Sequence, residues 1–101
     1  MYWQEEFIKE NGLTLVDSWS NNETYEWAEI EVYYSKEKKR YFWIEDVGCS
    51  CNSLWDSVKS IEDMCNGSRK NAIDAVGRFV KENNGRFGKD GNVNPSKLLS
   101  E

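Results

Sequence analysis

The three cysteines are the residues of this chain with the clearest potential for chemistry. Cys49 and Cys51 are separated by a single serine, and Cys65 lies further along the chain. A structural zinc site usually takes four thiolate or imidazole ligands, arranged in Cys-x₂₋₄-Cys pairs. With three thiols and no histidine, the chain would need a carboxylate such as Asp46 to complete that site. We expect no metal site, and keep a small thiolate metal-binding domain as an alternative.

Covalent catalysis has even less support from these residues. A cysteine nucleophile needs a base or a cation to hold it as the thiolate, and the absence of histidine excludes Ser-His and Cys-His arrangements. Redox pairs usually have the Cys-x-x-Cys spacing, whereas Cys49 and Cys51 are too close to bridge each other comfortably. A bridge from either to Cys65 stays open, but we expect buried, reduced thiols. We assign Gly48, Cys49 and Cys51 to a structural turn.

The neighbouring carboxylates Glu45 and Asp46 do not suggest an acid–base pair. Adjacent residues of a strand point to opposite faces of a sheet, so the two carboxylates would not meet at one substrate. Surface charge is the better interpretation. We therefore expect no catalytic residues and no enzymatic activity.

Charge is distributed unevenly along the chain. Residues 1–31 contain eight acidic residues and one base, Lys9, which gives this segment a net charge of −7, whereas the whole chain carries −5. Such a segment repels nucleic-acid backbones and attracts basic protein surfaces, although a solubilising surface is the alternative. Basic residues at 36–40 are interleaved with aromatics, a pattern that can bind single strands. We favour a charged hairpin tip that prevents edge pairing, and expect no direct nucleic-acid binding.

The elements that must position these residues follow from the hydrophobic pattern. It predicts a short helix over 2–10, strands over 13–19, 24–34 and 41–45, and a helix that begins after the Ser68 cap and runs to Asn84. The predicted fold class is α+β, with a three-stranded antiparallel meander packed against a C-terminal helix and a short N-terminal helix. We place a single domain over residues 1–85 and a flexible C-terminal tail over 86–101.

Strand faces and register follow from the alternation of side chains. In the first strand we expect Leu13, Leu15 and Trp19 on one side. In the second strand, Ala28, Ile30, Val32 and Tyr34 share one face, and Tyr25, Trp27, Glu29, Glu31 and Tyr33 share the other. Pairing of Ser35 with Arg40 would place Tyr34 opposite Tyr41 and Val32 opposite Trp43.

The segment between the cysteine turn and Ser68 has two interpretations. A helix capped by Ser53 would present Leu54, Val58, Ile61 and Cys65 on one side. A loop with only a short turn from Ser60 to Asp63 fits equally well.

Large aromatics on both faces of the meander suggest a second surface. Tyr25, Trp27, Tyr33 and Phe42 would line it, unless the N-terminal helix covers it through Trp3 and Phe7. Contiguous aromatic surface on a small domain often marks a binding site. We therefore predict a partner-binding surface made of Glu23, Tyr25, Glu26, Trp27, Glu29, Glu31 and Tyr33.

The run from Leu15 to Ser53 resembles a known group of sequences. It contains a strand, an aromatic hairpin with Phe42-Trp43, and then Gly48-Cys49-Ser50-Cys51. This pattern resembles a family of short uncharacterised phage proteins in which a Gly-Cys-Ser-Cys turn follows such a hairpin. The resemblance covers residues 12–80, and Asn52 stands where family members usually have proline. It implies a viral or prophage origin and no assigned chemistry.

Together these features predict a small, non-enzymatic binding protein in the host cytoplasm. The resemblance implies a counter-defence inhibitor of the anti-CRISPR type, which would occlude a basic, nucleic-acid-binding surface of a host protein. An alternative is a sponge that stacks a nucleotide between tryptophan and tyrosine rings. We expect no cofactor, and no membrane association because no apolar run approaches the roughly 20 residues that a span requires.

Overall fold

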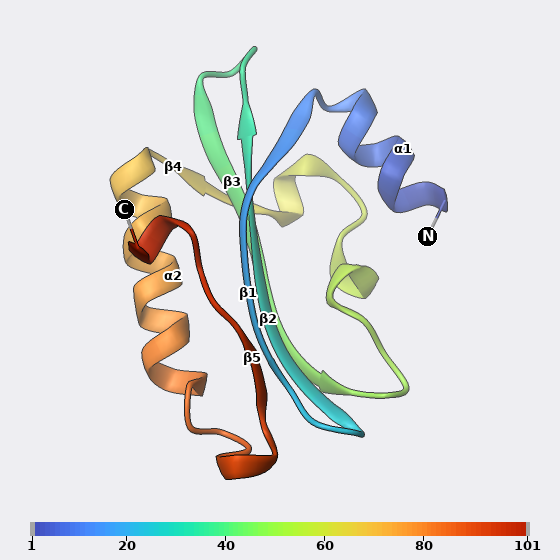
Figure 1. Ribbon diagram of the computed structural model, residues 1–101. Coiled ribbons are helices and arrows are strands. Elements are labelled where there is room, and N and C mark those ends of the chain that lie inside the picture. Colours follow the sequence, from blue (N-terminus) through green and yellow to red (C-terminus); the bar gives the residue numbers. More distant parts are fainter. Residues whose placement is uncertain (1, 101) are drawn as a thin grey trace.

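The computed structural model describes residues 2–100 and arranges them in three layers, with a sheet in the middle (Figure 1). The sheet is antiparallel, with strand order β4-β3-β2-β1-β5. Its strands are β1 (Leu13–Asn22), β2 (Glu26–Ser35), β3 (Arg40–Cys49), β4 (Cys65–Gly67) and β5 (Asn92–Asn94). Helix α1 (Tyr2–Glu10) lies on one side of the sheet and α2 (Arg69–Asn83) on the other. The predicted α+β class, with its meander and two helices, is confirmed, whereas β4 and β5 are additions at the sheet edges.

The register of the central hairpin agrees with the prediction. Ser35 pairs with Arg40, and the pairs Tyr34–Tyr41 and Val32–Trp43 follow. The rings of Tyr34 and Tyr41 lie 4.9 Å apart between centroids, which is within the range of favourable aromatic pairs.

The predicted faces of the first strand are wrong. A β-bulge interrupts the pairing of β1 with β2 between Leu15 and Asp17. Because one extra residue reverses the alternation of side chains, Leu13 and Trp19 lie on opposite faces of the sheet. Leu13 packs on the α1 side, and Trp19 packs against Phe79 of α2 with ring centroids 5.9 Å apart.

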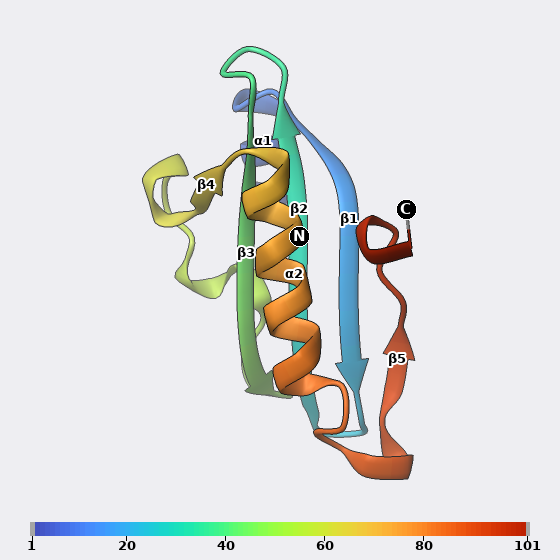
Figure 2. The same ribbon diagram turned by 90° about the vertical axis from the view of Figure 1, so that its left-hand side faces the viewer.

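Helix α2 closes one side of the sheet. It lies along the strands (Figure 2) and buries Ala28, Ile30 and Val32 completely. The helix begins as predicted, since the Ser68 side chain accepts a hydrogen bond from the backbone N–H of Asn71. No helix within residues 2–100 is long and apolar enough to span a bilayer.

The other side of the sheet is covered by α1 and by the segment that follows β3. That segment forms two short 3₁₀ helices, η1 (Leu54–Ser57) and η2 (Ile61–Asp63), in place of the single helix that was one of its two predicted interpretations. Each of these helices is preceded by a serine, Ser53 or Ser60, with an aspartate three residues later. The carboxylate of the aspartate accepts a hydrogen bond from the backbone N–H of the serine, in the pairs Ser53–Asp56 and Ser60–Asp63. Backbone hydrogen bonds lower the pKa of both aspartates, because they favour the charged form: at Asp63 the N–H of Lys59 contributes most and that of Ser60 next, and at Asp56 the N–H of Ser53 contributes most.

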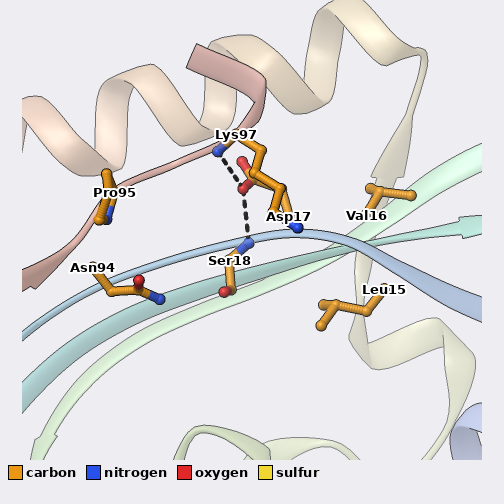
Figure 3. A pocket seen from close by; sticks show the side chains of 7 residues that line it. All are labelled: Leu15, Val16, Asp17, Ser18, Asn94, Pro95 and Lys97. Atoms are coloured by element: carbon orange, nitrogen blue, oxygen red, sulfur yellow. Dashed lines mark hydrogen bonds between the residues drawn. The ribbon is translucent and has the colours of Figure 1, made fainter. Parts of the chain in front are cut away.

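The segment from residue 86 to residue 100, which the sequence analysis assigned to a flexible tail, packs on the sheet. Its strand β5 pairs with the end of β1, and Leu98 is buried against the α2-side core. The buried carboxylate of Asp17 holds the segment, accepting hydrogen bonds from Ser96 Oγ, from Lys97 N at 2.7 Å and from Leu98 N at 3.2 Å. Figure 3 shows the hydrogen bond from Lys97 to Asp17 beside a small cavity of about 120 Å³.

We predict that Asp17→Ala lowers the free energy of unfolding by about 2–3 kcal/mol, because three donors of the C-terminal segment lose their acceptor. The measurement is urea denaturation, accompanied by trypsin cleavage at the exposed Lys89 and Lys97. Cleavage should accelerate in Asp17→Ala but not in Asp90→Ala, which removes an exposed carboxylate from the same segment. Equal stability and equal cleavage of the two variants would contradict this role of Asp17.

Candidate functional site

An open cavity of about 400 Å³ lies on the α1 side of the sheet, beside the loop that follows β3. We call it the acidic groove. It is lined by Gln4, Trp27, Glu29, Glu31, Asn52, Ser53, Leu54 and Trp55. Trp27, Glu29 and Glu31 come from alternate positions of β2, so that the strand itself places all three on one face.

Glu31 is held in the groove by two aromatic donors. Its Oε1 accepts a hydrogen bond from the Tyr33 hydroxyl and another from Trp55 Nε1, each 2.9 Å long. Both donors are neutral, so the carboxylate is oriented without being neutralised. Burial, followed by the charge of Glu31, raises the pKa of Tyr33, which therefore stays protonated and keeps donating.

Glu29 has no such support. Within residues 2–100 its half-buried carboxylate has neither a hydrogen bond nor an ion pair. Burial and, to a smaller extent, the charge of Glu31 raise the pKa of Glu29. Asp46 stands directly opposite on β3, and like charges in that position destabilise a sheet. The groove therefore contains negative charge that no residue between 2 and 100 compensates.

Trp27 connects the acidic groove to the cysteine turn. Its indole Nε1 donates to the carbonyl oxygens of Cys49, at 2.8 Å, and Asn52, at 3.2 Å. The ring is therefore fixed against the loop that borders the groove. Because a buried or half-buried indole N–H requires a partner, these bonds also fix the position of the loop relative to the sheet.

The cysteines form the predicted structural turn, which we call the thiol turn (Gly48–Asn52). The backbone N–H of Asn52 donates to the carbonyl of Cys49 at 3.2 Å, and the Asn52 side chain accepts from the Cys49 N–H at 2.9 Å. Gly48 permits the close approach of this side chain and of Trp27. A Cβ at position 48 would lie 2.6 Å from Asn52 Oδ1 and 2.6 Å from Trp27 Cζ2.

The expectation of buried thiols is wrong. Cys49 is half-buried, Cys51 and Cys65 are exposed, and all three are free. Cys65 also lies apart from the other two cysteines. It pairs with Trp43, which is six residues before Cys49 on β3, a distance of roughly 20 Å along the strand. Within residues 2–100, no group of three cysteine, aspartate or glutamate side chains is arranged to hold a metal ion. The three-thiol site of the metal-binding alternative is therefore not assembled.

The structure separates the seven residues of the predicted partner surface. Trp27, Glu29 and Glu31 line the acidic groove. Tyr33 is buried under α1 and η1, where its ring lies 5.8 Å from that of Trp55, so it does not reach the surface. The alternative in which Trp3 and Phe7 cover this face holds only in part. Both rings pack against Trp55, so they cover Tyr33 but leave the groove open.

The other three predicted residues lie at the end of the sheet. Tyr25 is 69% exposed, and its backbone N–H donates to Glu23 Oε1 at 2.6 Å. Glu26 pairs with Cys49 and lines a cavity on the opposite face from Glu29. The expected single acidic face is therefore divided, because Glu26 and Glu29 are an odd number of positions apart on one strand and so point to opposite faces.

Sequence reasoning missed five residues that line the groove: Gln4, Asn52, Ser53, Leu54 and Trp55. Trp55 lies in the segment whose structure the pattern left open, so its face was not predictable. Gln4 belongs to a correctly predicted helix, but a lone polar residue there carries no signal of what it faces. Asn52 follows the second cysteine directly, and its capacity to cap a turn was the available clue.

Comparison with known proteins identifies the family of this chain. The sequence model of a domain of unknown function, DUF7574, matches residues 3–93. The chain belongs to this family. No curated protein and no solved structure matches it. The matched region includes α1 except for Tyr2, the complete meander, the thiol turn and the first two residues of β5. It therefore contains every residue that lines the acidic groove.

We predict that Gly48→Ala lowers the free energy of unfolding by about 2 kcal/mol, because the added Cβ forces Trp27 and Asn52 out of position. Chemical denaturation measures the change. Gly85→Ala is the matched control, since no atom lies within 4 Å of a Cβ at that position. If Gly48→Ala were as stable as Gly85→Ala, the close packing of the thiol turn would be refuted.

We also predict that Glu29→Gln raises the free energy of unfolding at pH 7 by about 0.5 kcal/mol, the scale of a partly screened charge interaction. The raised pKa of Glu29 means that the folded state binds more protons than the unfolded state at mildly acid pH. The cost of the charged Glu29 is therefore fully present above the folded-state pKa and disappears below the unfolded-state value.

Urea denaturation of both proteins at pH 7 and at about pH 3.5, below the ordinary glutamate pKa of about 4.3, tests this prediction. The difference in stability should vanish at the lower pH. The exposed Glu62→Gln serves as the control for an equal change in net charge. A Glu29→Gln variant that is less stable than the wild type at pH 7 would contradict the prediction, because it would show that the Glu29 carboxylate makes a stabilising interaction.

Proposed function

We propose that this protein is a non-enzymatic binding protein that accepts a lysine or arginine side chain of a basic partner protein in the acidic groove. The observation that carries the proposal is the unpaired carboxylate of Glu29, which is half-buried beside Glu31 at an open cavity. A cation from a partner would supply the compensation that the chain itself lacks.

The energetics favour a cation at this position. Burial has already removed part of the water from Glu29, so the cost of desolvating this group on binding is smaller than for a fully exposed carboxylate. Glu31 is held in place by Tyr33 and Trp55 before binding. Preorganised acceptors lose little conformational entropy when a ligand arrives.

Trp27 adds a second kind of attraction. It lies two residues before Glu29 on the same face of β2, and its ring also lines the groove. A lysine or arginine head group within about 6 Å of a tryptophan face gains a cation–π interaction of about 0.5–2 kcal/mol. A basic side chain in the groove would thus contact both a carboxylate and an indole.

The same charges disfavour the alternative of a nucleotide-binding sponge. A phosphate in the groove would face Glu29 and Glu31, and no lysine or arginine lines the groove to offset them. Repulsion between like charges costs affinity, and it grows as water is excluded.

More specifically, we propose the counter-defence role that the resemblance to phage proteins implies, in which the protein blocks a basic, nucleic-acid-binding surface of a host protein. A nucleic-acid-binding protein presents lysine and arginine side chains at the surface that contacts phosphates. A groove that accepts one of these side chains would compete with the nucleic acid for it. The protein would then act in the cytoplasm of the host cell.

A binding measurement with hexalysine tests the groove directly. We predict binding at about 50 mM salt that is lost at about 500 mM, because screening weakens interactions between charges that remain accessible to solvent. Glu29→Gln should weaken binding by about fivefold, which corresponds to about 1 kcal/mol. Isothermal titration calorimetry gives both results.

Two controls separate the groove from the overall negative charge of the protein. Glu62→Gln removes the same charge at an exposed position outside the groove and should change the affinity less than about twofold. Trp27→Phe keeps the net charge and an aromatic ring but removes the indole N–H donor, so any change in its affinity for hexalysine comes from the groove and not from overall charge. Equal loss of affinity in Glu29→Gln and Glu62→Gln would contradict a specific site and leave only general charge attraction.

A further inference from the structure

The thiol turn has chemistry that the acidic groove does not use. Cys49 and Cys51 line the same open cavity of about 480 Å³, which has a different lining from the acidic groove apart from Asn52. Glu26 and Arg86 also line this cavity. A small molecule that enters it can therefore reach both sulfur atoms.

The backbone brings the two thiols toward bonding distance. Cys49 and Cys51 are the first and third residues of a hydrogen-bonded turn that ends at Asn52. Such a turn reverses the chain and shortens their Cα separation relative to an extended strand, toward the range of about 4.4–6.8 Å that disulfides accept. The turn therefore reduces, without removing, the strain that the one-residue spacing imposes on a disulfide.

The two thiols also differ in reactivity. A hydrogen bond from Cys51 is the main effect on Cys49, and it lowers the pKa of the Cys49 thiol. The same interaction raises the pKa of the Cys51 thiol, and the nearby carboxylate of Asp56 adds to that rise. Glu26 opposes the effect at Cys49 without reversing it. Cys49 is thus the better nucleophile of the pair at neutral pH.

We infer that Cys49 and Cys51 are a redox-active dithiol pair, which reduces small disulfides of the glutathione type and closes to an intramolecular disulfide. The inference rests on the shared cavity, the turn, and the position of a half-buried Cys49 beside an exposed Cys51, and it is independent of what binds in the acidic groove.

The reaction proceeds by two thiol–disulfide exchanges. The Cys49 thiolate attacks one sulfur of oxidised glutathione, which forms a mixed disulfide and releases one glutathione as thiolate. Cys51 then loses its proton and attacks the Cys49 sulfur, so that the Cys49–Cys51 bond forms and the second glutathione leaves. Two electrons pass from the cysteines to glutathione disulfide, and the two cysteine protons end on the two glutathione thiols.

The surroundings favour a reversible reaction with an anionic disulfide. Arg86 places a guanidinium at the cavity, where it can pair with a glutathione carboxylate. A disulfide across a single intervening residue is strained and exposed, and such disulfides are readily reduced. The pair is therefore suited to cycling rather than to permanent cross-linking.

The test uses the full-length Cys65→Ser variant, which leaves only the pair. Incubation with oxidised glutathione under native conditions should lower the mass by two hydrogen atoms, with no glutathione attached. Both thiols should then be unreactive toward dithionitrobenzoate, and reduced glutathione should restore them. Mass spectrometry and the thiol assay measure these outcomes.

The variants Cys49→Ser/Cys65→Ser and Cys51→Ser/Cys65→Ser are the matched controls. Each has one remaining thiol, so each should retain a stable glutathione adduct and show no loss of hydrogen. If Cys65→Ser also retained one or two glutathiones, or did not react, the two sulfurs would not exchange with each other and the inference would be overturned.

Discussion

The hydrogen bonds from the Trp27 indole to the carbonyls of Cys49 and Asn52 are the interaction on which both candidate sites depend. They join the sheet to the loop that follows β3. The ring lines the acidic groove, and its two acceptors belong to the thiol turn, which lines the cavity of the cysteines. Because only glycine at position 48 allows the ring and the Asn52 side chain to approach so closely, the packing of one residue determines the shape of both sites.

The groove exists because the two faces of the sheet are covered unequally. Helix α2 runs along one face and buries the whole row from Ala28 to Val32 (Figure 2). The shorter α1, with the segment from η1 to Met64, covers the opposite face over Tyr33, Phe42 and Ile44. The remaining part of that face carries carboxylates, which an apolar helix could not cover without a large cost of desolvation. Glu31 is satisfied by aromatic donors at the border, and Glu29 is left uncompensated beyond it.

Sequence reasoning was sufficient for the elements with strong periodicity and local capping. The alternation in residues 24–34 predicted the faces and register of the central hairpin, and Ser68 predicted the start of α2. It failed where a non-local contact decides the structure. The bulge that separates Leu13 from Trp19 has no local signature, and the packing of residues 92–98 depends on the buried Asp17 of a distant strand. The groove was half predictable: β2 supplied its carboxylates, whereas Asn52 and Trp55 come from a segment without a clear period.

The most direct test of the account is the pKa of the Glu29 side chain, measured by NMR titration of its carboxyl carbon in the free protein and in the presence of hexalysine. The account predicts a value in the free protein above that of glutamate in an unfolded chain, because of burial and Glu31. Bound lysine should lower it, since a cation favours the charged carboxylate. An ordinary value in the free protein, or a raised value that hexalysine leaves unchanged, would contradict the account.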